Sequence, residues 1–195
     1  MVQLPTSELL PEEISKIKNR LYDCPAVGGV SWSQRLLRVQ SEIIRIIDTT
    51  LELKKHFKIL NSRNDVKTFG SILGKINSYR RDGETSYDID SLEDLIGAQM
   101  LCPYPEDVTE ILNWLYDKRK GGKYFQLVTP RRKAEEERRD REIKTGYRAY
   151  HICLKLKKGV VPKLPSGSET DKFELQIKTL LEAAWDGKTH DVTYK

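Results

Sequence analysis

The sequence predicts an α+β domain in which helices flank a β-sheet, and three observations lead to this fold class. Residues 173–178 alternate apolar with charged or amide side chains, which is the period of a strand that buries one face. Residues 92–104 are almost continuously apolar, as expected of a strand at the centre of a sheet. Two longer segments, 9–22 and 32–58, place their apolar residues at helical spacing instead.

The composition is that of one globular domain with a positive net charge. The chain has 195 residues, enough to bury a sizeable core, and its 34 basic residues exceed its 29 acidic ones to give +5. This charge favours anionic partners such as nucleotides, RNA or acidic surfaces. The cysteines are scattered without metal or disulfide spacing, so we expect reduced, structural thiols at Cys24, Cys102 and Cys153. No long apolar run or signal-peptide core is visible, which predicts a cytoplasmic protein with no membrane segment.

Residues 1–60 are predicted to form a helical region that packs on a core of residues 61–195, within one compact domain overall. In this region 9–22 should be a short amphipathic helix, and 24–30 a loop. The apolar side of the short helix would consist of Leu10, Ile14, Ile17 and Leu21.

A long helix is expected at 32–58, because Ser31 and Gln34 have the spacing of a capping box at its start. Its apolar stripe, expected in the core, consists of Leu36, Val39, Ile43, Ile47 and Leu51. His56 lies near its end, where we expect a solvated or helix-terminal histidine that is not a ligand.

The segment 66–76 (VKTFGSILGKI) has a polar residue at every fourth position. On a helix, Lys67, Ser71 and Lys75 would share one face. Two interpretations stay open. The segment is either an amphipathic surface helix that buries Phe69, Ile72 and Ile76, or a phosphate-binding face close to the free N–H groups of a helix start. It lacks the glycine spacing of a Walker A loop.

Asp94 stands at the entrance of the predicted central strand, 92–104. A carboxylate in this place is either a cap or turn residue or part of a site, and the sequence favours neither. Beyond the strand, a helix should begin at Pro105 and turn four apolar residues inward: Val108, Ile111, Leu112 and Leu115. Residues 124–128 are expected to form a short strand.

Residues 129–145 carry seven basic and five acidic side chains but no aromatic one. The lack of aromatic residues argues against a platform on which RNA bases stack. The simpler interpretation is an exposed helix or a mobile loop of mixed charge. The alternative is a lid whose arginines bind phosphates or an RNA backbone.

The last part of the chain should contain two strands separated by a loop at 159–171. In the first strand, 146–155, three residues share a face: Tyr147, Ala149 and His151. In the second, 173–178, the face opposite the apolar one presents a polar row: Glu174, Gln176 and Lys178. A helical run from Thr179 follows and places three residues on one side: Leu181, Ala184 and Trp185.

Five motifs of this chain occur in the order found in RelA/SpoT-type alarmone synthetase domains, and the chain therefore resembles that family over residues 66–195. The motifs are VKTFGSILGKI, EDLIGAQM, GYRAYH, ELQIKT and a closing W…H…YK. The resemblance implies a mixed β-sheet flanked by helices and related to the nucleotidyltransferases. It also implies Mg²⁺-dependent transfer of pyrophosphate from ATP to the ribose 3′-hydroxyl of GDP or GTP.

The resemblance assigns roles to residues on the side of the pyrophosphate donor. The donor phosphates would be bound by Lys67, Ser71 and Lys75, with Arg63 close to this segment. Asp94 matches a magnesium-binding aspartate, and Glu174 matches a glutamate placed near the attacking hydroxyl and the metal. Such a hard cation prefers carboxylate and phosphate oxygens, which suits both residues. Glu174 could instead take the proton from the hydroxyl as a general base.

On the acceptor side, Tyr147 matches a tyrosine that stacks on the guanine, and His151 lies in the same motif. Gln176 and Lys178 stand beside the matched glutamate. Lys144 is one step from the position where the family usually has a lysine, here Ile143. The family's closing motif is matched by His190, Tyr194 and Lys195.

The departures from the family pattern concentrate on the donor base. The family usually sandwiches the adenine between two arginines, and this chain has Asp65 and Gln99 at those positions. Two alternatives stay open: Arg63 replaces one of them through a shifted loop, or the donor is bound in a different way. The serine that usually follows GYR is Ala149. The residues for phosphates and metal are therefore retained, whereas the adenine clamp is not.

Three hypotheses of function follow from the sequence. The first is an alarmone synthetase, the second a toxin-like enzyme that pyrophosphorylates the 3′ end of tRNA, and the third a non-catalytic nucleotide- or RNA-binding module. Asp94 and Glu174 favour catalysis, because two carboxylates facing phosphates repel them unless a metal is present. The family's hydrolase motif is not visible, so we expect no alarmone hydrolysis. A homo-oligomer and a fused or separate regulatory domain are both compatible with the resemblance.

Overall fold

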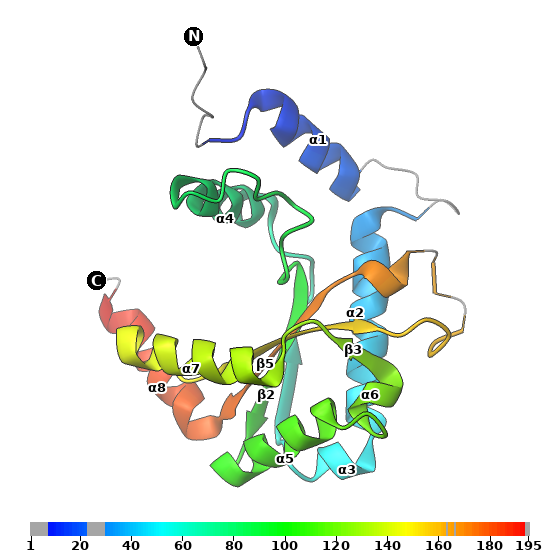
Figure 1. Cartoon of the computed structure of the whole chain (residues 1–195), viewed down its shortest axis with the longest axis vertical. Helices are drawn as coiled ribbons and strands as arrows, with labels where there is room; N and C mark the ends of the chain where they lie inside the picture. The colour runs from blue at the N-terminus through cyan, green and yellow to red at the C-terminus, as the bar shows by residue number, and fades with distance from the viewer. Residues whose placement is uncertain (1–7, 23–29, 163, 166, 194–195) are drawn as a thin grey trace.

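A computed structural model describes residues 8–22, 30–162, 164–165 and 167–193, with side chains as far as residue 186. Five strands form one sheet in the order β1-β2-β5-β4-β3 (Figure 1). Their bounds are Ile59–Ser62 for β1, Ile96–Cys102 for β2, Phe125–Leu127 for β3, Tyr150–Leu156 for β4 and Phe173–Thr179 for β5. β2 and β5 run parallel, and the other neighbouring pairs are antiparallel. The predicted mixed sheet of an α+β fold is thus confirmed.

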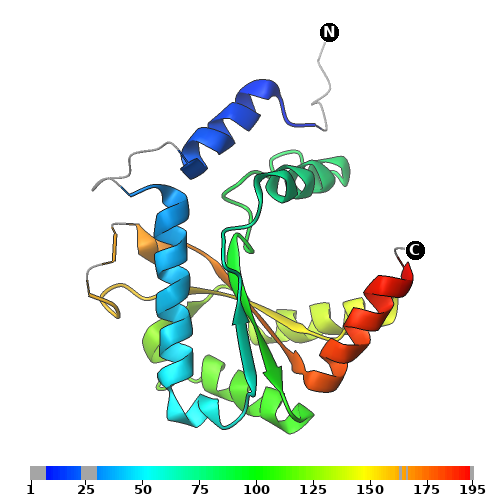
Figure 2. The ribbon, with the colours of Figure 1, turned by 180° about the vertical axis from the view of Figure 1, so that it is seen from behind.

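Helices surround the sheet on several sides (Figures 1 and 2). Their bounds are Pro11–Tyr22 for α1, Trp32–Thr49 for α2, Leu51–Lys54 for α3, Phe69–Arg81 for α4, Pro105–Tyr116 for α5, Gly121–Tyr124 for α6, Arg131–Thr145 for α7 and Leu180–Thr193 for α8. α2 packs on β1 and β2, α5 on β2 and β5, and α7 on β4. A short 3₁₀ turn, Ser168–Thr170, interrupts the predicted loop before β5. No helix in the described ranges is both long and apolar enough for a membrane span.

One face of the sheet is the hydrophobic core. The alternation predicted for the last strand is confirmed, since Phe173, Leu175 and Ile177 are fully buried. Their partners in register on β2 and β4 are also buried: Ile96, Ala98 and Met100 on one side, Ile152 and Leu154 on the other. Because successive side chains of a strand point to opposite faces, the residues between them form a second, polar face.

The start of α2 is held by the predicted capping box, since Gln34 N–H donates to the Ser31 hydroxyl and the Gln34 side chain accepts from the Ser31 N–H. The predicted helix 32–58 is wrong in its length, because Thr50 adopts an extended conformation between α2 and α3. This break turns Leu51 outward, and its side chain is 83% exposed, so it does not continue the apolar stripe. The other four residues of the stripe are buried.

Three further expectations need correction, and a fourth is not tested. Leu10 lies just before α1 and is 51% exposed, although Ile17 and Leu21 are buried as expected. His56 is not solvated, because its Nδ1 lies 2.8 Å from Oδ1 of Asp107 and its side chain is largely buried. The segment 66–76 becomes helical only at Phe69. Most of the predicted loop 24–30, and Cys24 with it, lies outside the described residues.

The buried Cys102 and Cys153 are free thiols, as predicted, and burial raises the pKa of each to about 12. They therefore stay protonated at neutral pH, as inert structural thiols do.

Candidate functional site

The polar face of the sheet carries the candidate site. In register across β2, β5 and β4 lie two rows, Gly97–Glu174–Cys153 and Gln99–Gln176–His151. Close packing explains why residue 97 is a glycine, because a Cβ there would lie 2.5 Å from the backbone oxygen of Glu174. Only glycine therefore lets β2 approach β5 closely beside the glutamate.

Asp94, two residues before β2, is the centre of what we call the Asp94 cluster, formed with Lys67 and Lys75. Its Oδ2 lies 2.6 Å from Nζ of Lys67 and 3.0 Å from Nζ of Lys75. Burial raises the pKa of Asp94, but hydrogen bonds and charges of the two lysines outweigh it, so the pKa lies below its ordinary value. The other carboxylate oxygen, Oδ1, is buried and has no hydrogen-bond partner among the described residues.

The two lysines reach Asp94 by different routes, and only one of them does so from a helix. Lys75 lies in α4, whereas Lys67 precedes the N-cap residue Thr68, and its backbone N–H bonds to the oxygen of Leu95 at 2.8 Å. The expectation that both lysines and Ser71 share a helical face is thus wrong for Lys67. The two ammonium groups nevertheless meet, because the chain passes Asp94 on its way into α4.

Ser71 and Arg63 lie at the edges of the Asp94 cluster. Ser71 is exposed in the first turn of α4, where its hydroxyl accepts a hydrogen bond from Thr68 at 2.8 Å. Arg63 follows β1 and donates from NH1 to the backbone oxygen of Asp94 at 2.7 Å. Asp65 is exposed, as expected for a residue that forms no part of this cluster.

Glu174 lies in a different environment, which we call the Glu174 network: His151, Gln176 and Tyr147. His151 Nδ1 lies 2.9 Å from Oε1 of Glu174, and Gln176 donates to Oε2 at 2.8 Å. Burial raises the pKa of Glu174. The hydrogen bond and charge of His151 and the hydrogen bond from Gln176 lower it by more, so the pKa lies below its ordinary value. His151 Nε2 is buried without a hydrogen-bond partner among the described residues.

Tyr147 extends this network towards α8. Its hydroxyl donates to Oε1 of Gln176 at 3.4 Å, and its ring meets that of His151 edge to face with centroids 5.7 Å apart. Nζ of Lys178 lies 5.1 Å from the centroid of the ring. Burial, with nearby carboxylates, raises the pKa of Tyr147 to about 12, so the phenol stays protonated. Tyr147 precedes β4 and is not in the strand predicted from residue 146.

Lys178, the last residue of the polar row on β5, is buried. Its side chain is only 5% exposed, and Nζ lies 2.6 Å from Oδ2 of Asp186 in α8. Asp186 is not among the residues predicted from the sequence, although it lies only eight residues after Lys178. Lys144, in contrast, is exposed near the end of α7 and forms no ion pair in the described part of the chain. The structure therefore separates Lys144 from the other site residues.

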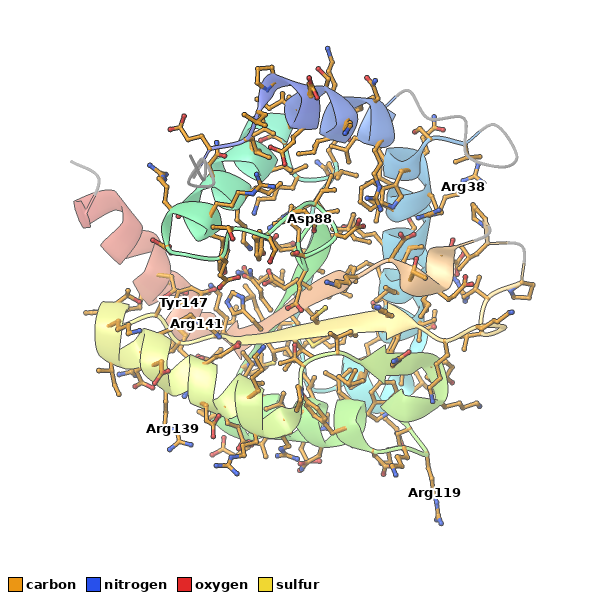
Figure 3. The ribbon with its side chains drawn as sticks, turned by 45° about the horizontal axis from the view of Figure 1, so that its top comes forward. Arg38, Asp88, Arg119, Arg139, Arg141 and Tyr147 are labelled. Atoms are coloured by element: carbon orange, nitrogen blue, oxygen red, sulfur yellow. The ribbon has the colours of Figure 1, made fainter. Side chains whose placement is uncertain are left out.

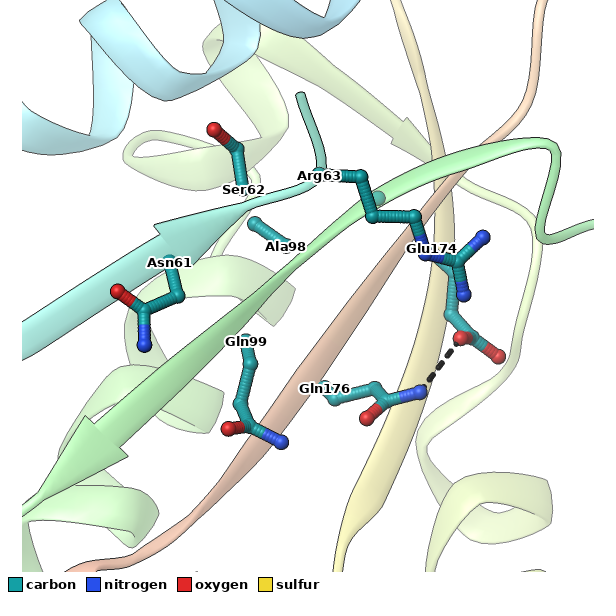
Figure 4. Close-up of a pocket in the computed structure, with 8 residues that line it drawn as sticks. Asn61, Ser62, Arg63, Ala98, Gln99, Glu174 and Gln176 are labelled. Atoms are coloured by element: carbon teal, nitrogen blue, oxygen red, sulfur yellow. Dashed lines mark hydrogen bonds between the residues drawn. The ribbon is translucent and has the colours of Figure 1, made fainter. Parts of the chain in front are cut away.

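Two hollows border Glu174 on opposite sides. The first, of about 260 Å³, lies towards β1 and is lined by Asn61, Ser62, Arg63, Gly97, Ala98, Gln99, Glu174 and Gln176 (Figure 4). The second, of about 370 Å³, lies between α4, α7 and β4, and its lining includes Lys75, Tyr79, Tyr87, Lys133, Arg141 and His151. Tyr79 and Tyr87, which the sequence analysis missed, stack with ring centroids 4.2 Å apart.

The basic segment 129–145 is mostly the helix α7, as the simpler interpretation of this segment allowed. Most of its basic residues pair with acids four positions away along the helix, as in Arg132–Glu136 and Arg138–Glu142. The arginines of α7 differ in orientation, since Arg141 points towards the sheet whereas Arg139 points outward (Figure 3). Arg141 donates to the backbone oxygen of Ala149 at 3.1 Å and lines the second hollow.

His190 lies in α8 without a described side chain, and Tyr194 and Lys195 lie outside the described residues, so the closing motif stays a prediction. Leu181 and Trp185 are exposed on α8, by 80% and 59%.

An open polar sheet face with two buried carboxylates and a lysine pair is the arrangement expected of a protein that binds phosphates. Comparison with known families makes this specific. Residues 64–195 match the model of the region found in RelA / SpoT proteins, and the chain therefore belongs to this family.

Two curated proteins of Bacillus subtilis (strain 168) are similar to the chain. GTP pyrophosphokinase YjbM is 28% identical over 130 residues, 67% of this chain and 54% of that protein. GTP pyrophosphokinase YwaC is 23% identical over 145 residues, 72% of this chain and 60% of that protein. The chain thus spans little more than half the length of these relatives.

Solved structures agree on the fold. Small alarmone synthetase 2 from Bacillus subtilis superposes with a TM-score of 0.57 at 18% identity, covering 82% of this chain and 77% of that one. Small alarmone synthetase 1 of the same organism, bound to its product pppGpp, superposes with a TM-score of 0.55 at 23% identity, covering 82% of this chain and 77% of that one. At these identities the likeness shows the fold alone.

Proposed function

We propose that this chain is a nucleotide pyrophosphokinase that transfers pyrophosphate from ATP to the ribose 3′-hydroxyl of GDP or GTP. The observation that carries the proposal is the pairing of the Asp94 cluster with the Glu174 network on one sheet face. Lys75 and Glu174 line the same hollow, so lysines for the phosphates and a carboxylate for the hydroxyl would lie close together there. The family membership and the named activity of the relatives YjbM and YwaC support it.

The donor phosphates would lie at the Asp94 cluster. Two ammonium groups against one carboxylate leave an excess of one positive charge, which attracts a triphosphate. Ser71 adds a hydroxyl at the start of α4, and Arg63 adds a guanidinium fixed to the backbone of Asp94. Phosphoryl transfer depends mainly on positioning and on neutralising charge, which are the two things this cluster supplies.

The acceptor would lie along the Glu174 network. Glu174 is ionised at neutral pH, as a carboxyl group with a pKa below its ordinary value must be, and its place in the network would let it accept the proton of the 3′-hydroxyl, a role worth about 10²–10⁴-fold. His151 and Gln176 hold both carboxylate oxygens in place. Tyr147 offers a flat ring for the acceptor base, and Lys178 braces that ring through its bond to Asp186. Lys144 would reach this acceptor only by a movement of the end of α7.

The residues present fit a magnesium ion held by Asp94 and Glu174. Asp94 Oδ1 is a buried acceptor without a partner in the described ranges, and Mg²⁺ usually takes one or two carboxylates together with substrate phosphates. Such an ion would supply neutralisation of charge on the phosphates.

The test is transfer of label from γ-labelled ATP with Mg²⁺ to GDP, GTP, adenine nucleotides and deacylated tRNA. Asp94→Asn and Glu174→Gln run beside wild type, with Glu110→Gln, an exposed residue of α5, as the matched control. Label moving to a guanine nucleotide, lost in both site variants and kept in the control, is expected. Label on tRNA alone would show that the acceptor is tRNA, as in the toxin-like hypothesis. If nucleotide binds but no label is transferred, the proposal that the chain is an enzyme is contradicted.

A further inference from the structure

The helix α1 precedes the region that matches the family, which begins at residue 64, yet it is bonded to the part of the chain that carries the Asp94 cluster (Figures 1 and 2). Two bidentate ion pairs make this connection. Arg80 of α4 donates from NH1 and NH2 to the carboxylate of Glu13, at 3.2 and 3.0 Å. Arg20 donates from both NH groups to the carboxylate of Asp90, with NH1 2.6 Å from Oδ2. The helix α1 is therefore tied at two points to the segment that runs from α4 to the Asp94 cluster.

Both ion pairs start from one side of α1. Glu13 and Arg20 are seven residues apart, which is about two turns of a helix, so their side chains lie one above the other. Ile17 stands between them in the sequence and is buried. This side of α1 thus has a charged contact at each end and an apolar residue between them, which fixes how the helix docks.

Arg80 is the centre of the contacts that hold the second half of α4. Its Nε donates to the backbone oxygen of Tyr87 at 2.8 Å, and the ring of Tyr87 stacks on Tyr79 of α4. Close by, the N–H of Leu9 donates to Oδ1 of Asn77 at 2.9 Å. The side chain of Arg80 is only 11% exposed and joins α1, α4 and the segment that returns to the sheet.

The position of α4 decides where the ammonium group of Lys75 lies. Lys75 is five residues before Arg80 in this helix of 13 residues, and its Nζ lies 3.0 Å from Oδ2 of Asp94. A helix of this length moves as a unit, so a shift at Arg80 displaces Lys75 as well. Lys67 differs, because it precedes the helix and its backbone N–H is bonded to Leu95 next to β2. Only one of the two lysines therefore depends on α1.

We propose that Glu13 and Arg80 are positioning residues of the donor-phosphate site. Through α4 they hold Lys75 beside Asp94, and they thereby set the affinity of the Asp94 cluster for the phosphates of the donor. The helix α1 acts on the site from outside the family region. This inference rests on the proposed function, because it takes the Asp94 cluster to bind the donor phosphates.

Binding of inorganic tripolyphosphate with Mg²⁺ reports on the phosphate site without a base or an acceptor. Calorimetry would compare wild type with Glu13→Ala at one fixed salt concentration, because salt screens the binding of phosphates. Glu13→Ala should lower the affinity about threefold to tenfold, as expected of a change that acts through a packed helix. Loss of a negative charge by itself would raise the affinity for an anion, so the direction of the change separates the two effects.

The matched control is Ile111→Val, which removes a methylene from the core beneath α5 and leaves the charges and α4 unchanged. It should lower stability in urea unfolding and keep the affinity for tripolyphosphate. Glu13→Gln retains the shape and one acceptor oxygen of the side chain, so its affinity should lie between those of Glu13→Ala and wild type.

A double-mutant cycle tests whether the effect passes through Lys75. In the background of Lys75→Met, Glu13→Ala should no longer change the affinity for tripolyphosphate. In the background of Lys67→Met it should still lower the affinity, because Lys67 is held independently of α1.

Three results would overturn the inference: an unchanged affinity in Glu13→Ala, an equal loss in Ile111→Val, or the same effect of Glu13→Ala with and without Lys75. Each of them leaves pyrophosphate transfer intact. Absence of label transfer by wild type, together with binding of tripolyphosphate that depends on Glu13 through Lys75, would instead contradict the proposed function and keep this inference.

Discussion

Asp94 is buried and Glu174 largely so, but the chain stabilises the charges of these two carboxylates in different ways. In the Asp94 cluster, two lysines surround one oxygen and leave the other without a partner in the described ranges. In the Glu174 network, a histidine and an amide each contact one oxygen, so that both oxygens are held in place and each keeps a further lone pair. The first arrangement has surplus positive charge and a vacant acceptor, which suits the binding of phosphates and a cation. The second fixes an orientation, which suits a group that must meet a hydroxyl.

The largest effect should separate the two carboxylates by kinetics. Glu174→Gln should lower kcat by about 10²–10⁴-fold even at saturating Mg²⁺, because the proton acceptor is lost in addition to one of the two proposed magnesium ligands. Asp94→Asn should instead raise the concentration of Mg²⁺ needed for half-maximal activity, since a ligand is lost. Steady-state kinetics over a magnesium series measures both, and equal behaviour of the variants would contradict the division of roles.

The next effect tests the close approach of β2 and β5 beside Glu174. Gly97→Ala should lower the free energy of unfolding by about 1–3 kcal/mol, because the new Cβ meets the backbone oxygen of Glu174 at 2.5 Å. Gly74→Ala is the matched control: nothing lies within 4 Å of its new Cβ, and the helix should gain about 0.5–1 kcal/mol. Urea unfolding measures both changes.

A smaller loss is expected when the Asp94 cluster is broken from the lysine side. Lys67→Met should lower the free energy of unfolding by about 2 kcal/mol, because it removes a hydrogen bond to a buried charge. Adding Asp94→Asn should recover part of this loss, since the remaining carboxamide carries no charge. Lys54→Met, which breaks the exposed pair with Asp48, should change stability by less than about 1 kcal/mol. If this double-mutant cycle gives no coupling free energy between Lys67 and Asp94, the ion pair of the Asp94 cluster is refuted.

The smallest effect is in the acid range and follows from the lowered pKa values of both carboxyl groups. The unfolded chain has ordinary carboxyl pKa values near 4 and takes up protons first as the pH falls. The stability that each group contributes is therefore present above that range and is lost as the pH falls through the lower pKa of the folded state. Wild type should lose more stability than Glu174→Gln or Asp94→Asn between about pH 5 and pH 2. A parallel pH profile for a variant would show that its carboxylate is not stabilised on folding.

Much of the local structure could be predicted from the sequence. The alternation of residues 173–178 gave the buried side of β5, and the capping box placed the start of α2. Of the motif residues singled out there, Glu174 lies on the polar face and Asp94 lies just before β2, whereas Lys144 lies apart from them and the closing motif stays a prediction. Such features can be predicted because they depend on residues that are close in sequence: a strand's alternation, a helix cap or a turn is formed by a few consecutive residues.

The sequence by itself determined the elements, the apolar side of β5 and the family; the tertiary structure alone decided which charges meet. Lys67 and Asp94 are 27 residues apart, and His151 and Glu174 are 23 apart. Their contacts depend on the order and register of the strands, which no local pattern specifies. The same holds for Lys178, which pairs with Asp186 because α8 folds back on β5, and for Leu51, which the break at Thr50 turns outward. Local preferences are settled by short-range sterics and hydrogen bonds, whereas these pairings are settled by how the whole core packs.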